Sequence, residues 1–357
     1  MSICSLNNSL SVPSGEVPSP SDFLAGVKMA RKALPADLYL LSKVSKLYYE
    51  RGLNQQEIAD KLHLSRPKVS RLLQQAQEEG IVQITVHSPP GTFADLEEAL
   101  ETRFGLKEAV VVEVVDAESQ DAVSRALGIA ASNYFKRNIQ DGDIIGISWG
   151  KTLNAMVNAL SPIETKNVHV VQMIGGLGQS EADEHATSLC RRLTQLLNSK
   201  LTLLPAPGIV DNQAVREAIL SDSHMQRVFE LFHKITVAYV GIGAPTPDSV
   251  VLRDGAIMSQ QDIADLKQRG AVGDIALRYF DLEGKLVYSE IDERVIGISL
   301  EQLKHIPHVV GITGGPQKED VVCGVLRGRW INALVTDQIT AKRMLELPLS
   351  DTKGSLL

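Results

Sequence analysis

Apolar residues near the N-terminus repeat at the spacing of three short helices. The segment LYLLSKVSKLYYERG has one apolar face and reaches a helix-ending glycine at Gly52. Asn54 offers a capping side chain for a second helix, and Ser65 offers one for a third helix that carries Pro67 in its first turn. The residues predicted to be buried in these helices are Leu41, Val44, Leu47, Tyr48, Ile58, Ala59, Leu62, Val69, Leu72, Leu73 and Ala76.

The connection between the second and third helices is only His63, Leu64 and Ser65. Two helices joined by so short a turn are typical of a helix-turn-helix, whose second helix enters the major groove of DNA. His63 stands where φ is expected to be positive, a conformation that glycine adopts easily and histidine tolerates at some cost.

The outward face of the third helix is basic and rich in amides, and Arg and Gln side chains can bond the edges of bases. For one amphipathic helix alone, a solvated charged face would be the simpler interpretation. The order of the helices and the short turn favour DNA binding instead. The predicted DNA contacts are Gln55, Ser65, Arg66, Lys68, Ser70, Arg71, Gln74 and Gln75.

The next segment, GIVQITVHSPPG from Gly80 to Gly91, has the pattern of a strand stopped by proline and is consistent with a small wing. Four apolar residues then repeat at helical spacing: Phe93, Leu96, Leu100 and Phe104. This spacing predicts a connecting helix within residues 89–107 that packs on the rest of the chain or on a second subunit.

Beyond residue 107, seven apolar runs alternate with amphipathic segments. The runs are AVVVEVV, DIIGISW, VHVVQMI, LTLLPA, ITVAYVGIG, HVVGIT and INALVT. Runs that are apolar throughout fit strands of a parallel sheet that is covered by helices on both faces. The pattern predicts a doubly wound, mostly parallel α/β domain over residues 108–347, with ligands at glycine-rich loops where strands end.

Charge divides the chain in the same way. Residues 28–80 hold ten Lys or Arg and six Asp or Glu, a formal charge of +4, whereas residues 81–357 carry −9. A basic N-terminal part fits the predicted DNA contacts. The expected organisation is a disordered tail over residues 1–35, a DNA-binding domain over 36–88, the linker helix, the α/β domain and a C-terminal tail over 348–357.

Cysteine content and hydropathy limit the cellular setting. The three cysteines are far apart and form no C-x-x-C pair, which indicates a reduced, cytoplasmic environment without a zinc site. The longest apolar run, from Ile235, is much shorter than the roughly 20 residues of a membrane span. No metal or cofactor site is predicted.

The loop GISWGKT follows a predicted strand and opens a predicted helix. It would surround a phosphate with backbone N–H groups, a cation and a hydroxyl at the helix N-terminus. A tight strand-to-helix turn without a ligand is the alternative. A nucleotide-hydrolysing P-loop is excluded because three residues, not four, separate Gly146 from Gly150. The candidate residues of this loop are Ser148, Gly150, Lys151 and Thr152.

Further glycine-rich segments lie in the same domain. The turn GGLG does not continue as G-x-G-x-x-G, which argues against a dinucleotide. In RGAVGDIALRYFD, Asp274 could accept bonds from sugar hydroxyls or hold a turn. In GITGGPQKED, two glycines permit close backbone approach, and Lys318 could reach an anionic group or remain solvated. The candidate residues of these segments and of VGIGAP are Gly175, Gly176, Gly178, Gly243, Asp274, Gly314, Gly315 and Lys318.

The order of these motifs resembles the SorC family of sugar-binding bacterial transcriptional regulators. The likeness runs from about residue 38 to residue 345 and ends in the segment INALVTDQITA. It implies a body similar to ribose-phosphate isomerases and glucosamine-phosphate deaminases, a phosphosugar-type effector, and dimers or tetramers. It also implies an effector site formed by Gly150, Lys151, Thr152, the GGLG glycines, Asp274 and Lys318.

We therefore expect a DNA-binding regulator, a repressor of a carbohydrate operon, that responds to a sugar or phosphosugar. A sugar-phosphate isomerase or deaminase is the alternative; it would need a positioned acid–base pair, of which the motifs supply only Asp274. A structural role would predict neither a ligand nor salt-sensitive DNA affinity. The expected partners are operator DNA, a small sugar or phosphosugar and further copies of the chain, with no membrane and no cofactor.

Overall fold

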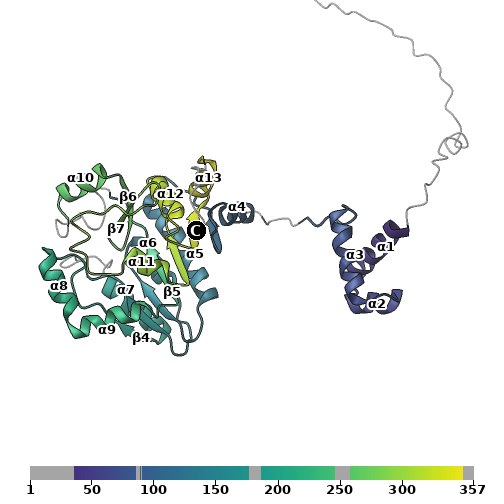
Figure 1. The fold of residues 1–357 in the computed structure, drawn as a ribbon, viewed down its shortest axis with the longest axis horizontal. Helices are drawn as coiled ribbons and strands as arrows, with labels where there is room; N and C mark the ends of the chain where they lie inside the picture. Colours follow the sequence, from purple (N-terminus) through teal and green to yellow (C-terminus); the bar gives the residue numbers. More distant parts are fainter. Residues whose placement is uncertain (1–35, 86–88, 90, 177–185, 246–257, 349–357) are drawn as a thin grey trace, which may run out of the picture. The chain divides into compact units, whose positions relative to one another are not determined.

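The protein is described by a computed structural model that covers residues 36–85, 89, 91–176, 186–245 and 258–348. It divides into two compact units, one up to His87 and one from Ser88 onward (Figure 1). The expected N-terminal tail, residues 349–357 and Gly178 lie outside the described residues. Over the described ranges, every helix is too short or too polar to cross a bilayer.

The first unit is a set of short helices around a small apolar core. Its elements are α1 (Ala36–Ser45), the π-helical turn η2 (Lys46–Glu50), α2 (Gln55–Leu62) and α3 (Arg66–Glu78). Together α1 and η2 form the single helix predicted before Gly52. Of the predicted inner-face residues, Tyr48, Leu62 and Leu72 are partly buried and all others are buried. The prediction of three amphipathic helices is therefore confirmed.

The strand predicted after Gly80 is wrong for residues 81–85, which form no regular element. Ile84 is 62% exposed, and the N–H of Val82 donates to the carbonyl of Ala76 at the end of α3. A strand needs a neighbouring strand for its N–H and C=O groups. The described part of this unit supplies none, so alternation of apolar residues alone did not produce a strand.

The second unit is built on a seven-stranded, fully parallel sheet. Each of the seven predicted apolar runs contributes one strand, so the predicted α/β class is confirmed. The strands are β1 (Glu108–Val112), β2 (Ile144–Ile147), β3 (His169–Gln172), β4 (Lys200–Thr202), β5 (Val237–Gly241), β8 (His308–Ile312) and β9 (Ala333–Asp337). Their order across the sheet is β1-β9-β8-β5-β2-β3-β4.

Helices cover both faces of this sheet and bury a separate apolar core on each. One face packs against α5 (Gln120–Asn138), α6 (Lys151–Ala159) and α7 (Ala186–Leu197). The other face packs against a larger group of helices. These are α4 (Ala94–Phe104), α8 (Gln213–Ser221), α9 (Ser223–Phe232), α10 (Gln260–Gln268), α11 (Leu300–Lys304), α12 (Glu319–Arg327) and α13 (Gln338–Glu346).

A separate antiparallel hairpin stands beside the main sheet. It consists of β6 (Ala271–Ile275) and β7 (Arg278–Asp281), joined by Ala276 and Leu277. An isolated antiparallel bridge between Gly243 and Asp274 joins it to the segment that follows β5. The sequence pattern did not predict this hairpin.

The predicted linker helix is α4, and it packs on the second unit. Leu100 is fully buried there, and the carboxylates of Glu101 and Glu97 accept the N–H groups of Ala109 and Val111 on the edge strand β1, each at 2.8 Å. Arg103 donates to carbonyl oxygens in and just after the last turn of α13. The helix therefore closes the free edge of the sheet, a common protection against unwanted strand pairing.

Gly128 allows α5 and α6 to approach each other closely. A Cβ atom at this position would lie 2.5 Å from Cβ of Ala155 and 2.7 Å from its backbone carbon. Such distances are well below van der Waals contact. The two helices thus lie side by side, and both begin at the carboxyl edge of the sheet.

Gly128→Val is expected to destabilise the second unit by about 1–3 kcal/mol, because the added methyl groups cannot fit between α5 and α6. Urea unfolding followed by tryptophan fluorescence measures this unit alone, since Trp149 and Trp330 both belong to it. Asn133→Val, at an exposed position of α5, controls for the general effect of placing a valine in this helix. Equal free energies of unfolding for the two variants would contradict the prediction.

Candidate functional sites

The turn between α2 and α3 has the geometry that its sequence indicates. The side chain of Asn54 accepts the N–H groups of Gln56 and Glu57, each at 3.0 Å, so the predicted cap is confirmed, and Glu57 accepts the N–H of Asn54 in return, which completes a capping box. His63 has φ 52° and ψ 44°, as predicted for this position. Ser65 has an extended N-cap backbone but its side chain makes no capping bond, so that part of the prediction is wrong.

The outward face of α3 is a continuous exposed surface. All predicted DNA contacts are exposed except Gln55, which is partly buried in the first turn of α2. Arg66, Lys68 and Arg71 form no ion pair with any residue in the described ranges. Free guanidinium and ammonium groups on one helix can neutralise phosphates or bond base edges.

The carboxyl edge of the sheet has a change of chain direction at its centre. β2 and β5 are neighbours, but the chain runs from β2 outward to β3 and β4, and from β5 in the opposite direction to β8 and β9. The loops that follow β2 and β5 therefore diverge. In α/β proteins, ligands bind outside the carboxyl ends of the strands at such a switch point.

The loop after β2 brings an uncapped helix end to this switch point. Gly150 is the N-cap of α6, has φ 138°, and has no side chain to cap the helix. Ser148 is buried and its Oγ accepts the N–H of Gly241 at the end of β5, at 3.1 Å. Lys151 lies 3.8 Å from the exposed carboxylate of Asp121 on α5. With Thr152 partly buried beside it, this helix end has the donors of an anion site.

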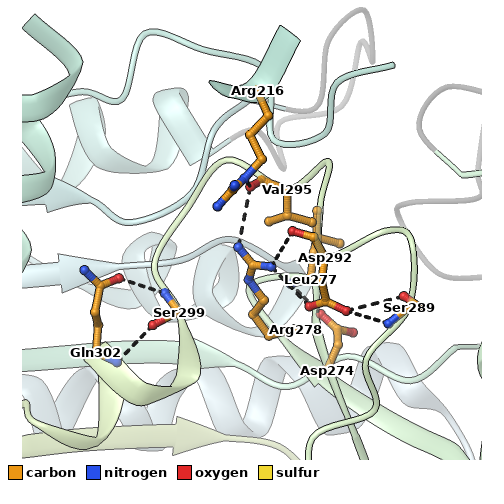
Figure 2. Close-up of polar contacts among 9 residues, drawn as sticks. All are labelled: Arg216, Asp274, Leu277, Arg278, Ser289, Asp292, Val295, Ser299 and Gln302. Carbon is orange, nitrogen blue, oxygen red and sulfur yellow. Dashed lines mark hydrogen bonds and ion pairs between the residues drawn. The ribbon is translucent and has the colours of Figure 1, made fainter. Parts of the chain in front are cut away.

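The loop after β5 is joined to Asp274 and Lys318. Gly243 and Asp274 exchange backbone hydrogen bonds at 2.9 and 3.1 Å, and the carboxylate of Asp274 lies directly over Cα of Gly243. Oδ2 of Asp274 also accepts the N–H of Leu277 at 3.1 Å (Figure 2). Nζ of Lys318, which precedes α12, donates to the carbonyl of Ile242 at 3.0 Å. Asp274 therefore holds a turn as well as standing at the switch point.

Burial shifts the titration of these two groups in opposite directions. It raises the pKa of Asp274 above its ordinary value, although the N–H of Leu277 and the charge of Lys318 oppose this. Burial lowers the pKa of Lys318, against the attraction of Asp274. Each charge thus partly offsets the cost of burying the other. Two groups with shifted pKa values beside the loop that follows β5 are a typical feature of a ligand site.

Of the remaining predicted glycines, Gly175, Gly314 and Gly315 are packed against other atoms of the protein. A Cβ at Gly314 would lie 2.3 Å from Oδ2 of Asp337, and one at Gly315 would lie 2.6 Å from Oε1 of Gln120. Gly175 is packed against the backbone of Ala206 and Pro207, whereas the position of a Cβ at Gly176 is open. The close approach predicted for Gly314 and Gly315 is therefore made by side chains of the protein, and ligand contact there stays a prediction.

Comparison with known proteins identifies the family. Residues 88–346 match the family model described as "Putative sugar-binding domain", and residues 47–83 match "Winged helix-turn-helix DNA-binding". The chain belongs to the SorC-type sugar-binding transcriptional regulators. It is 33% identical to the deoxyribonucleoside regulator of Bacillus subtilis over 85% of this chain and 96% of that protein. It is 33% identical to the sorbitol operon regulator of Klebsiella pneumoniae over 87% and 98%, respectively.

The fold of this SorC-type regulator is similar to solved structures of the family. The full-length sorbitol operon regulator of Klebsiella pneumoniae matches with a TM-score of 0.66 and 32% identity, over 87% of this chain and 100% of that one. A probable sor operon regulator from Shigella flexneri matches with a TM-score of 0.65 and 30% identity, over 71% and 99%. The DNA-binding head and the α/β body of the regulator are thus both represented among its relatives.

Four buried polar atoms of the regulator lie near the candidate effector loops and were missed by the sequence analysis. They have no hydrogen-bond partner in the described ranges: Trp149 Nε1, Gln120 Oε1, Thr313 Oγ1 and Thr336 Oγ1. Thr313 directly follows β8 and Trp149 lies two residues after the end of β2, positions that could have singled them out. Unpaired buried groups cost about 1–3 kcal/mol each and are expected where a polar ligand binds.

Arg71→Ala in the full-length regulator is expected to weaken binding to its specific operator by about 1–3 kcal/mol, because a base contact from α3 would be lost. Lys68→Ala is expected to weaken binding to all DNA sequences and to reduce the salt dependence of the affinity. Fluorescence anisotropy at several salt concentrations measures both effects. Lys136→Ala, an exposed change on α5, is the control. Unchanged operator affinity would remove Arg71 from the interface.

Lys318→Met is expected to remove a pH dependence of stability. Because burial lowers the pKa of Lys318 in the folded protein, the unfolded chain binds more protons between that lowered pKa and 10.5. The stability of the wild type relative to the variant should therefore rise from about pH 7.5 to about pH 10. Urea unfolding at both pH values measures this difference, and the exposed Lys285→Met should behave as the wild type. A difference independent of pH would contradict the prediction.

Proposed function

We propose that this regulator represses a carbohydrate operon and that a phosphorylated sugar, bound at the carboxyl edge of its sheet, changes its affinity for the operator. The names of its relatives support the carbohydrate part, since one is a sorbitol operon regulator and another a deoxyribonucleoside regulator. The exposed basic face of α3 supports operator binding.

The observation that carries the phosphate assignment is the uncapped start of α6 at the switch point. Gly150 leaves the first N–H groups of the helix without a side-chain acceptor, and the dipole of α6 favours negative charge there. The side chain of Lys151 is 36% exposed, and the carboxylate of Asp121 is 3.8 Å from its ammonium, so the ammonium can turn to a phosphate. Two neighbouring helices, α5 and α6, begin at this point.

The sugar part of the effector is assigned to the loop after β5. Gly243 leaves room for the carboxylate of Asp274, which supplies acceptor oxygens, and Lys318 supplies N–H donors. Sugar hydroxyls both donate and accept hydrogen bonds, so a carboxylate and an ammonium side by side suit them. The distance between the two loops then selects the length of the sugar.

A chain of hydrogen bonds supports a route from this site to the linker helix. Oδ2 of Asp337 accepts the N–H of Gly315 at 2.8 Å, and Oδ1 caps the first turn of α13. At the other end of α13, the carbonyl of Leu345 accepts a bond from Arg103 of α4 at 2.6 Å. We propose that effector binding favours one arrangement of α4, and hence of the heads in a dimer or tetramer.

Catalysis is not part of this proposal, because the relatives carry the names of regulators. An isomerase would need a positioned acid–base pair, and the sequence motifs supply only Asp274 as a candidate member of one. Turnover of any sugar phosphate by the purified protein would contradict this part.

Thermal unfolding of the full chain against matched sugars and sugar phosphates tests the effector site. A ligand of the native state raises the melting temperature, by several degrees when its concentration is about a hundred times Kd. We expect a sugar phosphate to stabilise the protein and the corresponding free sugar to have little effect. Lys151→Ala is expected to raise Kd at least about tenfold, as for loss of a charge-assisted hydrogen bond.

Lys136→Ala is the matched control, because Lys136 is exposed in the last turn of α5, at the opposite end of the helix from Asp121. It should bind the sugar phosphate as the wild type does. Stabilisation by free sugars alone, or by no compound, would refute the phosphate assignment and leave the DNA-binding head as the supported part.

A further inference from the structure

Arg278 is a buried arginine that lies one turn away from the candidate effector residues. It is the first residue of β7, directly after Ala276 and Leu277, and only 8% of its surface is exposed to solvent. Nη1 donates to the carbonyl of Asp292 at 3.0 Å and pairs with its Oδ1 at 3.1 Å, and Nη2 reaches the carbonyl of Val295 at 3.5 Å (Figure 2). Three bonds in one plane are what a guanidinium fork can make and an ammonium cannot.

The segment that Arg278 binds also leads to a contact with Gly175, the first residue of GGLG. Arg216 from α8 donates a second bond to the carbonyl of Val295, at 2.9 Å. The next residues contact the end of β3: the carbonyl of Ile296 accepts the N–H of Gly175 at 3.0 Å, and the N–H of Ile298 donates to Met173 at 2.8 Å. Arg278 therefore connects the β6–β7 hairpin to the backbone beside Gly175.

The hairpin itself is bent through an unfavourable turn. Ala276 has φ 52° and Leu277 has φ 63°, although a two-residue turn of this type normally carries Asn and Gly. The left-handed conformation is unfavourable for residues that have a Cβ atom. The turn is maintained by Asp274, which accepts the N–H of Leu277, and by burial of both turn residues. Backbone strain of this kind collects at functional sites.

We infer that the Arg278–Asp292 ion pair is the clasp that sets the distance between Asp274 and the Gly175–Gly176 turn, and that Arg278 is a positioning residue for the effector site. The strained turn directs the side chain of Asp274 to one side of the hairpin and the side chain of Arg278 to the other. The guanidinium then holds this hairpin against the segment 292–295, and the next residue, Ile296, accepts the N–H of Gly175. This inference rests on the proposed function in assigning those two parts to one ligand.

Hydrogen exchange of the full chain without ligand tests the clasp itself. In Arg278→Lys, which keeps the charge but loses the fork, the amides of Gly175, Leu277 and Ile298 are expected to exchange at least about tenfold faster than in the wild type. Amides of β8 and β9 should be unchanged. Asp292→Asn is the second variant, because it removes the charge of the partner and leaves Arg278 in place.

Arg327→Lys is the matched control, since Arg327 forms a comparable ion pair with Glu283, at 2.7 Å, on the outer side of α12. It should leave the exchange at Gly175 unchanged. Equal exchange in Arg278→Lys and wild type would overturn the clasp, whatever the result for ligands.

Ligand titration then tests the positioning role. The probes are inorganic phosphate and five- and six-carbon sugar phosphates, and the compound with the largest wild-type thermal shift is used for all variants. Arg278→Lys is expected to raise Kd for that sugar phosphate at least about tenfold and to change the effect of inorganic phosphate less than twofold, because phosphate alone needs only the start of α6.

The outcomes separate the two proposals. If no sugar phosphate stabilises the wild type, the proposed function fails while the exchange experiment still decides the clasp. If exchange rises in Arg278→Lys but the Kd for the sugar phosphate stays the same, the clasp is only structural and the positioning role is overturned. An equal loss for inorganic phosphate and sugar phosphate would also overturn it, because the start of α6 would then be disturbed.

Discussion

The pairing of β2 with β5 is the constraint on which the rest of the body depends. Because the chain leaves these two strands in opposite directions, their loops diverge, and the glycine-rich segments after each strand stand at one edge of the sheet. The same arrangement places α5 beside α6, where Gly128 allows the helices to touch. Residues separated by up to two hundred positions in sequence are brought to one place by this topology.

The site that results lowers the stability of the folded protein. Asp274 and Lys318 are charged groups removed from water, and the turn after Asp274 is held in a left-handed conformation without glycine. Several polar atoms at the same edge lack partners among the described residues. Natural proteins retain such features where a bound ligand offsets their free-energy cost, and elsewhere replace them with apolar packing.

The proposed connection from this site to the linker helix α4 runs through ordinary capping interactions. Asp337 binds the Gly315 loop and the first turn of α13, while Arg103 on the linker helix binds the last carbonyls of α13. A short rigid helix with a partner at each end can transmit a small displacement. The carboxylates of α4 on the edge strand β1 hold the linker in register with the sheet.

Much of the secondary structure of this protein could be predicted from the sequence alone by local rules. Helix caps, helical periodicity and short apolar runs identified the three head helices, all seven strands of the main sheet and the positive φ of His63, because each depends on neighbouring residues. The glycine loops after β2 and β5 could be located for the same reason.

Tertiary structure alone decided the features whose partners lie far away in the chain. It determined that residues 81–85 remain outside a strand, that Gly314 and Gly315 are filled by Asp337 and Gln120, and that Arg278 clasps the segment beside Gly175. A strand needs a pairing edge, and a buried arginine needs acceptors from another element. The local pattern of apolar residues shows neither the neighbouring strand nor the distant acceptors, so only the folded chain reveals them.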